Sequence, residues 1–109
     1  MIVSDANSHR VIGSFPIGNG CDGVAFDPGT RRIFASNGEG TMTVIQQLSA
    51  DKYKVVENFT TQPGGRTITL DPTTHHIYLS AGEYLPVTGR DRGVKPDSFK
   101  VIEIEPINN

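Results

Sequence analysis

The sequence contains a single cysteine, no tryptophan and no long apolar run. Because Cys21 stands alone, an internal disulfide is excluded, and redox chemistry indicates no compartment. No apolar stretch approaches the roughly 20 residues that a membrane-spanning helix needs. The first residues also lack the basic start and apolar stretch of a signal peptide, so the signal of an exported parent protein would lie outside this sequence.

The sequence also lacks a strong excess of charge of either sign. Ten Lys and Arg residues stand against 12 Asp and Glu residues, so the formal net charge is −2, which gives no electrostatic reason to expect nucleic acid as a partner. No segment keeps a helical apolar stripe over the ~10–12 residues that a helix requires. The 12 Gly and 7 Pro residues instead favour short strands joined by tight turns.

An internal repeat organises the chain. The tract 20–39 recurs at 64–83, and the same offset of 44 residues separates Asp27 from Asp71 and Ser36 from Ser80. We call residues separated by this offset equivalent. A period of this length in a chain rich in β signals is typical of propeller blades or of another repeat array.

The pattern predicts strand after strand, with no helix. We expect strands at 11–17, 23–27, 32–37, 41–46 and 53–61, a polar loop at 48–52, and a second series of strands at 67–71, 76–81 and 99–106. Asp27-Pro28 and Asp71-Pro72 each predict a type I turn, since proline pre-sets φ and the aspartate can bond the backbone ahead. Matching Val101 to Val44 gives an offset of 57, which predicts thirteen inserted residues at 84–96.

Four strands per period is the composition of a propeller blade. The predicted fold is therefore all-β, a partial β-propeller of four-stranded antiparallel blades in one domain. Residues 1–18 would end one blade, 19–62 would form a complete blade, and 63–109 an incomplete blade carrying the inserted loop.

Closed propellers contain about four to eight blades, so this chain cannot close a ring by itself. We expect either a homo-oligomer or the remainder of a larger propeller as its partner. In the homo-oligomer, strand 11–17 would fill the fourth place of a neighbour's last blade, and three or four chains would supply roughly six or eight blades.

Three motifs that suggest chemistry have simpler interpretations. Residues 18–23 spell G-x-G-x-x-G, but a predicted strand follows, where a nucleotide site needs a helix N-terminus. His75 and His76 are neighbours on a strand and point to opposite faces, so we interpret them as turn-surface residues. Asp27 and Asp71 hold equivalent turns. The sequence thus predicts no catalytic residue, no cofactor and no metal.

One candidate binding face remains. Cys21, Asp22 and Arg66 precede the first strands of the two copies, and the first strand of a blade lines the propeller axis. Glu83 and the inserted loop lie at the same end; this loop contains Tyr84, Arg90 and Arg92. Such a loop suits a protein or small-molecule ligand, or equally an edge cover or subunit contact. Cys21 lacks a visible histidine base and is expected to be a small packing residue.

The segments 23–28 and 32–37 resemble the YVTN-type β-propeller repeat, and 43–45 and 11–18 are similar to its later parts. The chain departs from that pattern at Ala81, where the family has asparagine, and through the insertion. The resemblance implies an extracytoplasmic, periplasmic or extracellular propeller that acts as a scaffold. Related propellers include lactonases and amine-dehydrogenase subunits. Because the shared residues are structural, we favour a non-enzymatic binding or scaffold module; the alternative is part of a propeller enzyme with its site at the channel mouth.

Overall fold

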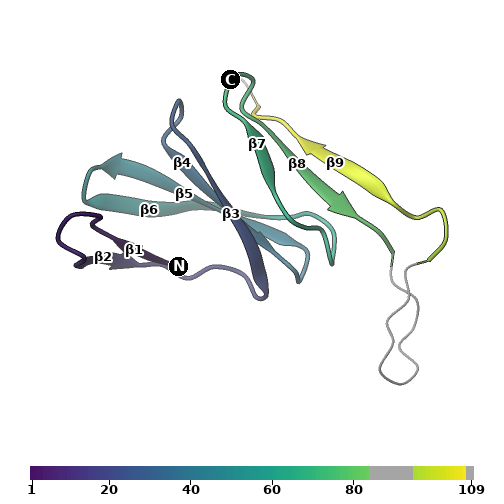
Figure 1. The fold of residues 1–109 in the computed structure, drawn as a ribbon, viewed down its shortest axis with the longest axis horizontal. Helices are drawn as coiled ribbons and strands as arrows, with labels where there is room; N and C mark the ends of the chain where they lie inside the picture. Colours follow the sequence, from purple (N-terminus) through teal and green to yellow (C-terminus); the bar gives the residue numbers. More distant parts are fainter. Residues whose placement is uncertain (84–94, 108–109) are drawn as a thin grey trace.

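The computed structural model describes residues 1–83 and 95–107, and within those ranges the regular secondary structure is entirely β (Figure 1). The first sheet comprises β1 (Ile2–Ser4) and β2 (Val11–Ser14). The middle sheet comprises β3 (Cys21–Asp27), β4 (Arg32–Asn37), β5 (Thr41–Ser49) and β6 (Lys52–Thr60). The last sheet comprises β7 (Thr69–Asp71), β8 (His76–Ala81) and β9 (Lys100–Ile104). All pairings are antiparallel between consecutive strands, which confirms the predicted all-β class. In the described part of the chain no helix is long and apolar enough to cross a membrane.

Most strand boundaries lie close to the predicted ones, although β3 begins earlier, at Cys21, β7 begins later, at Thr69, and β9 ends earlier, at Ile104. Two other predicted segments also differ from the structure. The polar loop predicted at 48–52 is wrong, because β5 continues to Ser49 and β6 begins at Lys52, so that only Ala50 and Asp51 form the turn. The strand predicted at 11–17 ends at Ser14. Pro16, two residues later, has no N–H with which to continue the ladder.

The pairing of β8 with β9 corrects the predicted register. Ile77 pairs with Ile104, whereas its equivalent Ile33 pairs with Ile45. The offset in the third strand is therefore 59 residues and not 57, so the connection between β8 and β9 is longer by fifteen residues. Matching valine to valine misjudged the register by two, a shift that leaves each side chain on the expected face because strand side chains alternate.

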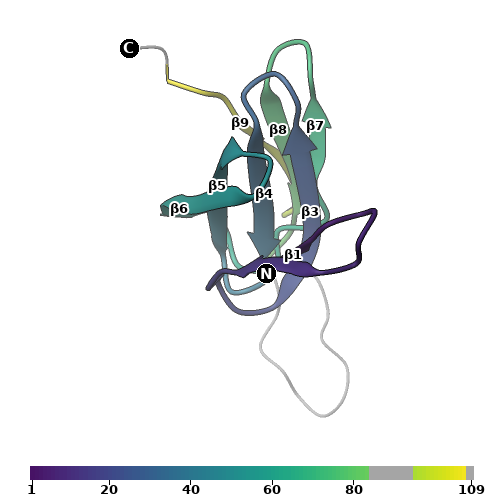
Figure 2. The same ribbon diagram turned by 90° about the vertical axis from the view of Figure 1, so that its left-hand side faces the viewer.

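The three sheets are stacked in chain order, with the middle sheet between the other two (Figures 1 and 2). Phe34, Met42 and Val44 of the middle sheet form one core cluster with Ile77 and Leu79 of the last sheet. On the other face of the middle sheet, the Tyr53 ring lies 6.1 Å from that of Phe15, which follows β2. These contacts show that the core lies between sheets. Burial of each large apolar side chain there stabilises the fold by about 1.5–3 kcal/mol.

The first strands of the two larger sheets, β3 and β7, lie side by side. Gly23 makes this approach possible, because a Cβ placed there would lie 2.9 Å from Cγ2 of Ile68. A side chain at position 23 would therefore push the two sheets apart.

The turn after the first strand is the same in both copies. The Asp27 carboxylate accepts a hydrogen bond from the Gly29 N–H, and the Asp71 carboxylate accepts one from the Thr73 N–H, both at 2.9 Å. Each turn closes on a residue of positive φ, Arg31 at 59° and its equivalent His75 at 64°. The predicted role of both aspartates in holding turns is confirmed.

Candidate functional site

A cavity of about 790 Å³ lies where the connections of the middle and last sheets meet. Three pairs of equivalent residues contribute to its lining, and the link between the sheets completes it. The lining residues are Gly20 and Gly64, Asp22 and Arg66, Gly38 and Gly82, together with Gln62, Pro63 and Glu83. The repeat therefore brings the same positions of two copies to one place.

Backbone groups form much of the cavity wall. The Gly38 N–H donates to the Gly20 carbonyl at 2.7 Å, and the Gly64 N–H donates to the Gly38 carbonyl at 2.9 Å. Gly20 and Gly64 have φ angles of 74° and 77°, a region that other residues rarely adopt. The glycines at these equivalent positions thus let the chain turn tightly enough to enclose the cavity.

Serine side chains fix the link between the sheets. The Ser36 hydroxyl donates to the Gly65 carbonyl at 3.3 Å, and its equivalent Ser80 donates to the Arg66 carbonyl. The Arg66 N–H in turn donates to the Ser80 carbonyl at 2.8 Å. Arg66 is therefore held by β8 through its backbone, which leaves its exposed side chain at the cavity.

The charged lining consists of one guanidinium and two carboxylates. Asp22 Oδ1 is shielded from solvent and has no hydrogen-bond partner among the described residues. A shielded acceptor of this kind costs about 1–3 kcal/mol unless a donor reaches it. No ion pair joins Asp22 to Arg66 within residues 1–83 and 95–107, so both groups can serve a bound molecule. The Glu83 carboxylate lies 3.3 Å from Lys95 Nζ, and both side chains are exposed.

The structure brings together three of the residues singled out from the sequence. Asp22, Arg66 and Glu83 all line the cavity. Cys21 is exposed and its thiol lies 3.7 Å from the Gly23 carbonyl, so its expected role as a packing residue is wrong. It is the first residue of β3.

Tyr84, Arg90 and Arg92 lie outside the described residues. The base of their loop is described. The Lys95 N–H donates to the Glu83 carbonyl at 2.7 Å, and the Glu83 N–H donates to the Ser98 hydroxyl at 2.9 Å. Because Glu83 lines the cavity, the inserted loop begins at its rim.

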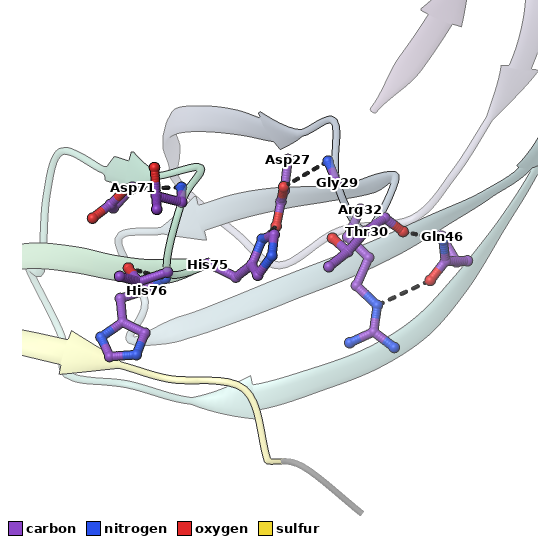
Figure 3. Close-up of polar contacts among 10 residues, drawn as sticks. Asp27, Gly29, Thr30, Arg32, Gln46, Asp71, His75 and His76 are labelled. Atoms are coloured by element: carbon purple, nitrogen blue, oxygen red, sulfur yellow. Dashed lines mark hydrogen bonds and ion pairs between the residues drawn. The ribbon is translucent and has the colours of Figure 1, made fainter.

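A second polar contact, which the sequence did not predict, lies at the other end of β3. His75 Nδ1 lies 2.6 Å from Oδ2 of the fully buried Asp27, as Figure 3 shows. Burial raises the pKa of Asp27, but hydrogen bonds from His75, the Gly29 N–H and Thr30, together with the His75 charge, outweigh it and hold that pKa below its usual value. His75 is therefore an inter-sheet contact and not simply a turn-surface residue.

His76 has partners within the last sheet. Its Nδ1 lies 2.7 Å from Glu103 Oε1 and its Nε2 lies 3.7 Å from Glu105 Oε2. In the described ranges no group of three histidine, cysteine, aspartate or glutamate side chains is arranged to hold a metal ion. Among these features, the cavity between the copies is the one that brings together residues singled out from the sequence.

No family model, no curated protein and no solved structure matches this chain. Its class is therefore defined by the observed features alone: an internally repeated all-β protein of antiparallel sheets with a cavity between the copies.

Proposed function

We propose that the chain is a non-enzymatic binding or scaffold module that forms part of a β-propeller. The observation that carries the proposal is the convergence of equivalent residues from two copies on one cavity. Blades arranged around an axis place each first strand next to that of the following blade. The contact between β3 and β7 supports this arrangement. The resemblance to YVTN-type repeats adds an extracytoplasmic location to the proposal.

The strand content of the sheets also supports this architecture. The middle sheet has the four consecutive strands of a blade, and the last sheet has the first three. The first sheet holds a pair that corresponds to a third and a fourth strand. Residues 1–109 would then contribute a part, a whole and three quarters of a blade, and the remaining blades of a closed ring would come from further copies or from the remainder of a larger propeller.

The chemistry of the cavity favours binding over catalysis. Its lining includes the Arg66 guanidinium and two carboxylates, which suits a small molecule or peptide end that carries charges of both signs. A nucleophile needs a base within hydrogen-bond reach, whereas within residues 1–83 and 95–107 the hydrogen-bond partner of the Cys21 thiol is the Gly23 carbonyl. The enzyme alternative draws its support from the shielded oxygen of Asp22, because burial of carboxylates is one route to acid–base catalysis.

Titration of the isotope-labelled protein with free arginine, glutamate and a dipeptide, followed by amide NMR shifts, tests the proposal. We expect shifts at Gly20, Gly38 and Gly64 for at least one probe, abolished by Asp22→Asn or by Arg66→Ala. Arg10→Ala, which changes an exposed arginine outside the cavity, is the matched control and should bind as the wild type does. Absence of shifts at the cavity glycines with all three probes would overturn the binding role. Hydrolysis of a lactone that requires Asp22 would favour the enzyme alternative.

A further inference from the structure

The last sheet lies at the end of the stack. Its outward face is equivalent to the face of the middle sheet that the last sheet covers. On the middle sheet, Phe34 and Met42 lie in the core beneath the last sheet. By strand register, their counterparts on the last sheet are Tyr78 and Val101. Val101 is 59% exposed and the nearby Phe99 is 72% exposed. The outward face of the last sheet therefore exposes positions whose counterparts on the middle sheet are buried.

The middle sheet exposes the complementary surface on its opposite face. Val24 and Phe26 of β3 are 55% and 49% exposed. Their equivalents Ile68 and Leu70 pack against the core between the middle and last sheets. Val24 and Phe26 stay open because the first sheet supplies only a strand pair, and a cavity of about 540 Å³ separates them from β1. The first and second strands of another sheet would cover these two side chains.

Charges at the two ends match as well. Between the two sheets, His75 reaches Asp27 of the preceding copy. The equivalent of His75 is Arg31, which is exposed and enters no ion pair within the described ranges. The equivalent of Asp27 is Asp71, whose Oδ1 atom accepts the Thr73 N–H of its own turn as Asp27 Oδ1 accepts the Gly29 N–H. Arg31 on one copy and Asp71 on another would repeat the contact that already joins the sheets.

In the described part of the chain, the last sheet has three strands, β7, β8 and β9. Among the described residues, β9 pairs only with β8, so its other edge is unpaired. A groove of about 540 Å³ between the middle and last sheets is lined by Phe59 of β6 and by Ile104 and Ile107. An unpaired edge next to an apolar groove is a site for strand addition.

We propose that a second copy of this chain docks head to tail, with its last sheet on the exposed β3 surface of the first copy. The sheet formed at this contact has the order β7-β8-β9-β2, in which β2 comes from the other copy and takes the place that β6 has in the middle sheet. This arrangement satisfies the apolar faces, the Arg31–Asp71 charges and the edge of β9 together. It deepens the proposed architecture and does not depend on the ligand cavity.

Docking requires β9 to replace β1 beside β2. The β1–β2 pairing covers three residues and contains a register irregularity between Val3 and Ser4. The competing strand β9 is regular over Lys100–Ile104. A three-residue pair is weak by itself, so β1 acts as a temporary cover that the longer strand displaces.

Charge exchange tests the contact by sedimentation velocity at micromolar concentrations. Arg31→Asp and Asp71→Arg each place like charges at the contact, so each variant alone should associate at least about tenfold more weakly than the wild type. An equimolar mixture of the two should associate again, because each contact in an alternating assembly then joins opposite charges. A mixture that stays as dissociated as its components would overturn the proposal.

Further variants distinguish this interface from non-specific hydrophobic association. Val101→Lys should abolish association, whereas the matched control Val56→Lys, on β6, which pairs with no strand of the proposed sheet, and 44% exposed, should leave it unchanged. Val3→Pro removes a β1 ladder donor and should strengthen association by releasing β2. A wild-type chain that sediments only as a compact monomer, or equal effects of the two lysine substitutions, would overturn the proposal. These outcomes do not affect ligand shifts at the cavity glycines, so the two proposals fail separately.

Discussion

His75 Nδ1 lies 2.6 Å from Asp27 Oδ2, so a turn of the last sheet is joined to the buried end of a strand in the middle sheet. The Asp27 carboxylate also accepts the Gly29 N–H within its own turn. One buried side chain therefore holds both a local turn and the neighbouring copy. Its Oδ1 atom holds the β3–β4 turn, and its Oδ2 atom binds the histidine of the neighbouring sheet.

Removing the histidine should cost stability. We expect His75→Ala to lower the free energy of unfolding by about 1–3 kcal/mol, because one oxygen of a buried carboxylate loses its partner. Urea denaturation at neutral pH measures this change. His76→Ala is the matched control, since its Glu103 partner is exposed and such pairs contribute at most about 1 kcal/mol. Equal losses for the two variants would contradict the inter-sheet role.

The Asp27 contact also predicts a pH dependence. Burial raises the pKa of Asp27, but hydrogen bonds from His75 and the Gly29 N–H lower that pKa by a larger amount. The pKa of Asp27 in the folded protein therefore lies below its ordinary value. The folded protein therefore binds fewer protons than the unfolded chain in this range. The resulting stabilisation is fully present above the unfolded pKa of about 3.9 and is lost as the pH falls through the lower folded pKa.

Comparison of the wild type with Asp27→Asn isolates this effect. The difference in unfolding free energy should be largest near pH 7 and should shrink between about pH 5 and pH 2. Asp5 and Asp71, whose pKa values are lowered chiefly by backbone N–H donors of Ser8 and Thr73, are present in both proteins and cancel. A difference that stays constant across this range would contradict the assignment. Urea midpoints at matched ionic strength provide the measurement.

Local chemistry made the repeated turns predictable from the sequence. Asp-Pro at 27–28 and 71–72 dictates where each first strand ends, and alternating apolar residues dictate β4 and β8. These features depend on neighbours in the chain, so a pattern of residue types is sufficient to find them.

Contacts between distant segments could not be predicted in the same way. The β8–β9 register depends on the hydrogen-bond ladder across a long connection, where a shift by two residues preserves the alternation of faces. The partnership of His75 with Asp27 depends on how two sheets are stacked. The one available signal was that both copies place a basic residue four positions after the turn aspartate, at Arg31 and His75.

Prediction of the cavity was partial for the same reason. Asp22 and Arg66 were found because the repeat places them at the same end of adjacent copies. The exposure of Cys21 was missed, since a pattern of residue types does not tell which side of a strand end the neighbouring sheet leaves open.

Asn37 gives a prediction about the difference between the copies. Its buried side chain donates to the hydroxyls of Thr41 and Thr43, at 3.1 Å each, and so closes the β4–β5 turn. The equivalent Ala81 has no such group. We expect Asn37→Ala to lower the free energy of unfolding by about 1–2 kcal/mol, measured by urea denaturation. The exposed Asn7→Ala should change it by less than about 0.5 kcal/mol, and a similar value for both would contradict a structural role of Asn37.

The approach of β3 to β7 predicts a coupling between two positions. Gly23→Ala places a methyl group 2.9 Å from Cγ2 of Ile68, and overpacking of this kind costs about 1–3 kcal/mol. Ile68→Ala removes that Cγ2 atom and leaves a gap between the sheets, which should cost about 2–5 kcal/mol when made alone. In the double variant the new methyl group partly occupies the gap that the isoleucine left. The loss of stability should therefore be smaller than the sum of the single losses by at least about 0.5 kcal/mol, a coupling that a double-mutant cycle in urea can resolve. Strict additivity would mean that the sheets separate at this point without strain, and that Gly23 does not set the distance between the two copies.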